Sequence, residues 1–155
     1  MAIDRDKALA MAPAVTQMRV DASRLRFFAR ATGQTDPIYT DLATARAKGH
    51  RDLPVSPTFL FGLGMEGPDP FGFVEQLGID LRTVLHGTQD FTYHTLAYAG
   101  DELTMTSRVS DVYTRKGGVL EFIVRDSQVR SSDGTLIAEL RAVMVVQNRA
   151  SEETS

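Results

Sequence analysis

LTMTSRVSDVYTRKGGVLEFIVRDSQVRSSDGTLIAELRAVMVV, residues 103–146, alternates apolar and polar side chains over most of its length. Alternation at every second position is typical of half-buried strands, because successive side chains of a strand point to opposite faces of the sheet. Gly117-Gly118 and Asp133-Gly134 interrupt the alternation at two positions that suit tight turns. The stretch therefore predicts three long antiparallel strands joined by hairpins.

The preceding part of the chain adds two strands, near residues 17–20 and 86–93, and several helices. Residues 59–65, FLFGLGM, are apolar almost all round, so a helix there is expected to be buried on most sides. Shorter helices are expected in residues 21–33 and 41–49, since an Asp precedes each and a Gly ends each. The elements together predict an α+β domain in which an antiparallel sheet packs on an apolar helix.

The composition favours one domain, because 155 residues with 43% hydrophobic side chains suffice for one core but not two. We expect residues 1–14 to form an N-terminal extension, residues 15–148 the domain and residues 149–155 a disordered polar tail. A net charge of -3 argues against a nucleic-acid partner, and the lack of long apolar runs argues against a membrane one. Without cysteine or a signal-peptide core, the chain is expected to be cytoplasmic.

Residues 33–39, GQTDPIY, carry a resemblance to a known family. The segment resembles the active-site segment of the MaoC-like, R-specific enoyl-CoA hydratases, which reads Gly-Asp, any residue, Asn-Pro, an aliphatic residue and His. Segments 54–58, 85–89 and 98–103 resemble later family landmarks in the same order. The likeness spans residues 15–148 and is greatest to the N-terminal, fatty-acid-synthase-like dehydratase branch. It implies the hot-dog fold, a five-stranded antiparallel sheet wrapped around a central apolar helix.

The reactive side chains of that family are missing at the matching positions. Hydration of an enoyl thioester needs a base, an acid and donors for the oxygen that gains negative charge. The family uses Asp and His, where this chain has Gln34 and Tyr39. Gln34 exchanges no proton at neutral pH, and Tyr39, with an ordinary pKa near 10, is a poor base. Pro57 also lacks an N–H at the turn where the family has a His-Gly pair.

The resemblance implies a subunit that shapes an acyl pocket while a homologous MaoC-type partner supplies the catalytic Asp and His. The expected ligand is an acyl-CoA or acyl carrier thioester, with no cofactor and no metal. The candidate substrate-binding residues are Gln34, Asp36, Tyr39, Ser56, Pro57, Thr58, His86 and Gly87. Asp36 stands two residues from the lost Asp and is a candidate displaced base, although Thr-Asp-Pro is also a common turn. His86 can serve either in binding or in the structure.

Two alternatives stay open at the level of sequence. One is a homodimer that binds an acyl-CoA or regulates without turnover, because a fold does not fix a function. The other is a hot-dog thioesterase, which would need a carboxylate such as Asp36, Glu66 or Glu75 to activate water. A dimer is expected for the hydratase subunit and for the binding module, since long exposed edge strands invite association.

Overall fold

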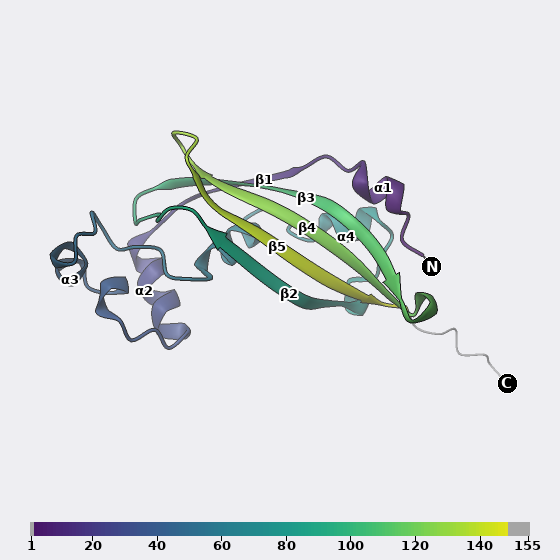
Figure 1. Cartoon of the computed structure of the whole chain (residues 1–155), viewed down its shortest axis with the longest axis horizontal. Coiled ribbons are helices and arrows are strands. Elements are labelled where there is room, and N and C mark those ends of the chain that lie inside the picture. The colour runs from purple at the N-terminus through teal and green to yellow at the C-terminus, as the bar shows by residue number, and fades with distance from the viewer. Residues whose placement is uncertain (1, 149–155) are drawn as a thin grey trace.

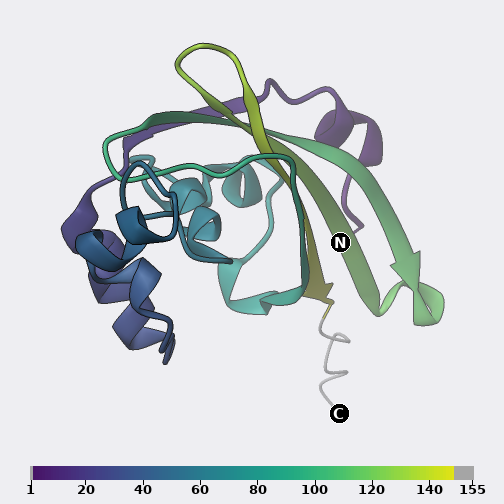
Figure 2. The same cartoon turned by 60° about the vertical axis from the view of Figure 1, so that its left-hand side comes forward.

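The chain forms one five-stranded sheet that curves around short helices in a computed structural model that describes residues 2–148 (Figures 1 and 2). Every neighbouring pair is antiparallel, and the strand order is β1-β3-β4-β5-β2. The strands are β1 (Ala14–Arg19), β2 (Val84–Tyr93), β3 (Glu102–Arg115), β4 (Leu120–Ser131) and β5 (Leu136–Gln147). The three predicted hairpin strands are thus confirmed, and Gly118 and Gly134 take positive φ in the two turns.

The helices are short, and five of the eight in residues 2–148 begin at a carboxylate cap. They are α1 (Arg5–Leu9), α2 (Ala22–Ala31), α3 (Leu42–Ala47), α4 (Gly72–Gln76) and the 3-10 helices η1 (Pro37–Tyr39), η2 (Phe59–Met65), η3 (Leu81–Thr83) and η4 (Lys116–Gly118). Asp21 accepts from the first N–H groups of α2, and Asp41 accepts from Thr44 in α3. Both predicted helix starts are confirmed, because a carboxylate satisfies amides that lack an intrahelical acceptor.

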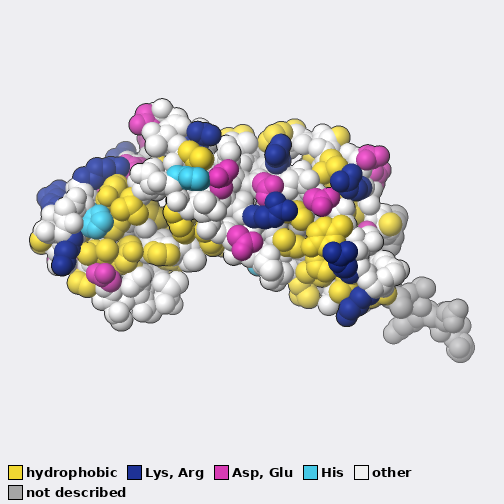
Figure 3. Space-filling model, in the orientation of Figure 1, with side chains coloured by type: hydrophobic (Ala, Val, Ile, Leu, Met, Phe, Trp, Pro, Cys, Tyr) yellow, Lys and Arg dark blue, Asp and Glu magenta, His cyan; other side chains and the backbone are white. Residues whose placement is uncertain are grey.

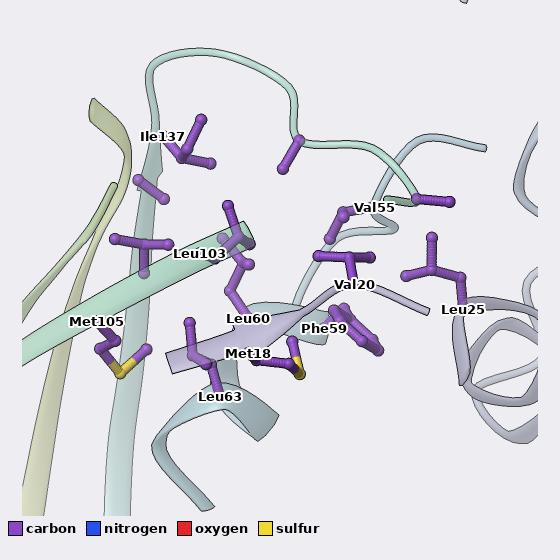
Figure 4. Packing of buried hydrophobic residues seen from close by; sticks show 14 of the residues in the cluster. Met18, Val20, Leu25, Val55, Phe59, Leu60, Leu63, Leu103, Met105 and Ile137 are labelled. Atoms are coloured by element: carbon purple, nitrogen blue, oxygen red, sulfur yellow. The ribbon is translucent and has the colours of Figure 1, made fainter. Parts of the chain in front are cut away.

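The main core lies between η2 and the concave side of the sheet (Figure 4). Leu60 and Leu63 are 1% and 0% exposed and point toward Leu103 and Met105 of β3. Met105 pairs with Val129 of β4, so the inward positions of the long strands meet the helix. The expected arrangement of an antiparallel sheet around an apolar helix is confirmed.

One side of η2 departs from the expected burial. Phe61 and Met65 are 41% and 38% exposed although they belong to the same apolar run. A single sheet covers only part of the circumference of a helix, and the contact of His86 with the Phe61 ring leaves much of this side open. The expectation that the helix is buried on most sides is therefore wrong for the side that carries Phe61.

The alternation in β4 left open which of its two sets of side chains faces the core. The structure directs Glu121, Ile123 and Arg125 to the concave side, and Ile123 packs with Met144 in a second apolar cluster. On the opposite face of the sheet, acidic and basic side chains are interspersed (Figure 3), as in the 3.0 Å pair of Arg141 with Asp126.

The residues expected to form an N-terminal extension close one end of this second cluster. Ala8 of α1 is fully buried there, and the Ile3 N–H donates to Oε1 of the buried Glu121 at 2.7 Å. Asn148 donates to the other carboxylate oxygen at 2.6 Å, so Glu121 joins both ends of the described chain. The predicted disordered tail, residues 149–155, lies outside the described residues. Within residues 2–148, no helix has the length and hydropathy to cross a membrane.

Candidate functional site

The loop after α2 brings the predicted site residues Gln34 and Asp36 together. Gln34 Oε1 accepts from the Asp36 N–H at 3.1 Å, and Asp36 Oδ1 accepts from the Ile38 N–H at 3.1 Å. Asp36 is thereby the N-cap of η1, which is the turn role that the Thr-Asp-Pro sequence favours. Its carboxylate already has a structural partner.

Tyr39 ends η1 with a half-buried side chain. Burial raises the pKa of Tyr39, and the negative charges of Asp36 and of ionised Tyr93 raise it further. The neutral phenol is therefore the stable form at neutral pH, because desolvation disfavours tyrosinate. Tyr39 can donate a hydrogen bond here but is unsuited to accept a proton.

This direction of shift gives a pH-dependent prediction. Because the folded-state pKa of Tyr39 lies above its unfolded value, neutral Tyr39 contributes stability that is fully present below about pH 10 and is lost as pH rises through the folded-state pKa. We expect Tyr39→Phe to reduce this alkaline loss, which begins at about pH 10 and continues above it. Urea denaturation of both proteins below and above about pH 10 measures this loss of stability. A midpoint below about pH 8 in an absorbance titration of Tyr39 would contradict its raised pKa.

Thr58 and Tyr93 meet at the start of η2. Thr58 takes a positive φ of 69°, and its N–H donates to the Tyr93 hydroxyl at 2.8 Å. The hydroxyl accepts this bond and keeps its own proton, which it can donate to a further acceptor. The amide at this position is therefore occupied by a side chain of the same protein. We call Asp36, Tyr39, Thr58 and Tyr93 the Tyr93 cluster.

Ser56 and Pro57 precede this cluster in the chain. Ser56 is 3% exposed, and its Oγ has no hydrogen-bond partner among the described residues. Buried hydroxyls nearly always form a hydrogen bond, so the Ser56 hydroxyl can still bond to a water, a ligand or a partner protein. Pro57 is exposed and offers no N–H, as its sequence position predicts.

His86 and Gly87 lie on β2 and have different surroundings. His86 is exposed, and its ring packs edge to face on the Phe61 ring, with 5.5 Å between the ring centres. Gly87 sits where the register of β2 against β5 shifts, and a Cβ there would lie 2.8 Å from the Val143 carbonyl oxygen. The close approach of two backbones accounts for Gly87 without a ligand.

Gly87→Ala is expected to lower the free energy of unfolding by about 1–3 kcal/mol, since the backbone oxygen of Val143 cannot move aside as a flexible side chain would. Gly62→Ala is a matched control, because its Cβ would meet nothing within 4 Å. The control should be neutral or stabilising by about 0.5–1 kcal/mol. Urea denaturation compares the two variants, and equal stability would reject the steric account.

The other carboxylates considered for catalysis lie apart from the Tyr93 cluster or are already paired. Glu66 forms an ion pair with Arg24, whose guanidinium lowers the pKa of the Glu66 carboxyl. Glu75 lies exposed on α4. The part of the chain that the structure describes has no group of three His, Asp or Glu side chains that could hold a metal ion. The cluster thus offers hydroxyl donors but no acid and base pair.

Sequence reasoning missed Tyr93 as a site residue. Its contact with Thr58 joins positions 35 residues apart, and no periodicity or local motif predicts it. The only available signal was the aromatic residue at the end of an expected strand, and many core residues share that signal.

Comparison with known proteins gives a family model, sequence relatives and structural neighbours. The model of the FAS1-like dehydratase domain region matches residues 10–140. A relative from Streptomyces griseus subsp. griseus, named UPF0336 protein, is 35% identical, with 99% of each chain covered. Another UPF0336 protein, from Parafrankia sp., is 36% identical and covers 85% of this chain and 86% of its own length.

Three solved structures share the fold at low identity. The HadBC (3R-hydroxyacyl-ACP dehydratase) complex from Mycobacterium tuberculosis has a TM-score of 0.74 at 20% identity, covering 89% of this chain and 98% of the other. The ChsH1-ChsH2 complex of the same organism has a TM-score of 0.73 at 23% identity, covering 94% and 96%. An (R)-hydratase from A. caviae has a TM-score of 0.67 at 19% identity, covering 86% and 92%. The chain has the expected hot-dog fold and belongs to the family of the FAS1-like dehydratase domain region.

Proposed function

We propose that this protein is the pocket-forming subunit of an R-specific enoyl-thioester hydratase or 3-hydroxyacyl-thioester dehydratase. A homologous MaoC-type partner supplies the catalytic Asp and His. The observation that carries the proposal is the pairing of a hydratase-like fold with Gln34 and Tyr39 at the two proton-transfer positions. Asp36 does not replace the missing base, because its carboxylate caps η1.

The exposure of the edge strand β2 supports the proposed association with a MaoC-type subunit. β2 pairs only with β5 in the described chain, and most of its residues are exposed. An unpaired edge of ten residues is a template for another strand. Beside this edge lie Phe61, 41% exposed, and Tyr93, 46% exposed. We call the free edge of β2 together with Phe61, His86 and Tyr93 the β2 face.

A second hot-dog subunit is the occupant that suits the β2 face. Its own edge strand can continue the sheet through backbone hydrogen bonds, while its side chains cover the exposed apolar ring of Phe61. HadBC and ChsH1-ChsH2, which share the fold, were both solved as complexes. In this arrangement the partner docks beside Tyr93, so a thioester at the junction can contact both subunits.

In the proposed complex, the Tyr93 cluster lies on the substrate side of the junction between the two subunits. The hydroxyls of Tyr39 and Tyr93 can donate to polar atoms of the thioester, since a phenol O–H is a hydrogen-bond donor and burial favours the neutral form of Tyr39. Ser56 adds a buried hydroxyl without a partner. These groups orient a substrate, whereas the partner performs both proton transfers.

The isolated chain is expected to lack crotonyl-CoA hydration, and co-expression with a MaoC-type partner should restore it. General acid and base groups contribute roughly 10²–10⁴-fold each to rate, so the gain should be at least of that order. Steady-state assays of the separate and combined proteins measure it. A partner whose catalytic Asp is changed to Asn is the control and should leave the complex inactive. Robust hydration by this chain alone would overturn the proposal.

A homodimer that binds acyl-CoA without turnover is the second candidate. The same observation favours it, because the β2 face can pair with a copy of itself in a two-fold arrangement. Equilibrium dialysis of acyl-CoA with the chain alone separates the candidates. Tight binding by a homodimer that forms no complex with any MaoC-type partner would favour this alternative over the hydratase subunit.

A further inference from the structure

Arg125 of β4 is a cation on the core side of the sheet. Its half-buried side chain extends toward α4, where its guanidinium lies 4.2 Å from the centre of the Phe73 ring. Burial lowers the pKa of Arg125, because a buried guanidinium is poorly solvated by water. No carboxylate among residues 2–148 lies within ion-pair distance, whereas Arg141 on the outer face pairs with Asp126. The Phe73 ring offsets only part of the lost hydration.

Arg125 lines a cavity of about 280 Å³. The walls combine apolar groups with a few polar ones and include Met11, Val15, Gly67, Phe73, Gln76 and Ser107. The Ser107 hydroxyl is already bonded to Ser127 at 2.7 Å, which leaves Arg125 as the strongest free donor. The cavity reaches Gly64 at the C-terminal part of η2, whereas the Tyr93 cluster lies at the start of that helix. The two sites therefore occupy different ends of η2.

We propose that this cavity binds a short aliphatic carboxylate, with the carboxylate on Arg125 and the hydrocarbon against Met11 and Phe73. The planar guanidinium matches a carboxylate through two parallel N–H donors. Asp69 also lines the cavity and repels any anion there, so a singly charged carboxylate is opposed less than a doubly charged phosphate. The volume is smaller than that of a site for drug-sized ligands, so the hydrocarbon part is short.

The carboxylate can come from two sources with the same chemistry. One is a free short-chain acid, which requires nothing of the proposed function. The other is the far end of an ω-carboxylated acyl thioester that extends along η2 from the Tyr93 cluster. This second source rests on the proposed function and would define its substrate class.

Thermal unfolding of the isolated chain with hexanoate tests the site directly. A ligand at about ten times its Kd should raise the Tm by roughly 3–5 °C in the wild-type protein. Arg125→Gln should abolish the rise, and Arg125→Lys should retain only part of it, because an ammonium lacks the two-pronged geometry. Arg108→Gln is the matched control, since it removes an exposed arginine from the neighbouring strand β3. Hexanol and inorganic phosphate should give no rise in any variant.

A second variant keeps the test independent of Arg125. Gly67→Val leaves the charge intact and fills the cavity, and the position tolerates a Cβ because the nearest atom to it, Thr16 Oγ1, would be 3.8 Å away. This variant should fold and lose the hexanoate response. A response that survives in both Arg125→Gln and Gly67→Val would overturn the site.

Binding of adipyl-CoA and hexanoyl-CoA, compared by equilibrium dialysis, identifies the source. If the wild-type protein binds adipyl-CoA more tightly than hexanoyl-CoA and Arg125→Gln removes this preference, the thioester source is supported. A hexanoate response without such preference supports the free acid. Failure of both ligands to bind through Arg125 would reject the site. None of these measurements needs a catalytic partner. Failure of the carboxylate site can therefore be distinguished from failure of the hydratase proposal.

Discussion

Phe61→Asp should weaken the association of this protein with its MaoC-type partner at least about 100-fold while the chain stays folded. Truncation of an anchor residue at the centre of an interface typically costs 2 kcal/mol or more, and a buried unpaired carboxylate adds a desolvation cost. A loss of about 2.7 kcal/mol corresponds to that 100-fold change. Folding should survive because Phe61 is 41% exposed in the single chain.

The matched control is Val15→Asp, which places the same charge at an exposed position on β1, the opposite edge of the sheet. Calorimetric titration of the partner into both variants measures the two affinities, and circular dichroism verifies the fold. Unchanged affinity for Phe61→Asp with a large loss for Val15→Asp would move the interface to the β1 edge. The hydratase activity of the mixture should follow the same order, because the substrate is proposed to bind at the junction.

Leu60→Ala should lower the free energy of unfolding by about 3–5 kcal/mol, the upper part of the range for large-to-small core changes. Leu60 is 1% exposed and lies between η2 and the sheet, where a sheet on one side and a fixed helix on the other resist collapse of the cavity (Figure 4). Urea denaturation monitored by circular dichroism gives the value.

Leu96→Ala is the control for this core substitution, since Leu96 is 50% exposed and its loss should cost below about 1 kcal/mol. Comparable losses in the two variants would show that η2 is not tightly packed on the sheet. Because η2 begins directly after Thr58, a loosened helix should also displace the Thr58 N–H from the Tyr93 hydroxyl. The core and the proposed substrate site are coupled through this one bond.

Under the proposed function, the Tyr93 cluster also explains how a chain with Gln34 and Tyr39 in place of the family's base and acid can still shape a reaction site. Hydrogen-bond donors that are fixed before substrate binding stabilise developing charge without further reorganisation. The Thr58 N–H donates to the oxygen of the Tyr93 hydroxyl, and this bond directs the phenolic proton away from η2. In the proposed function, a subunit of this kind positions a thioester, and a partner supplies the proton transfers.

The sequence alone determined the features that depend on short-range regularities. Alternation between residues 103 and 146 is a local consequence of strand geometry, and the Asp21 and Asp41 caps satisfy amides only two or three residues away. The missing proton-transfer groups were also readable, because Gln34 and Tyr39 lack suitable chemistry wherever they lie. Fold class and the absence of the family's acid and base pair therefore came from the residues themselves.

Only the tertiary structure decided which surfaces are covered and which distant groups meet. The exposed side of η2 depends on how far one sheet can wrap a helix, and the sequence of that helix is apolar on both sides. The contact of Thr58 with Tyr93 and the cavity at Arg125 each join segments far apart in the chain. Such contacts follow from the packing of whole elements, because local propensity carries no information about which distant side chains become neighbours.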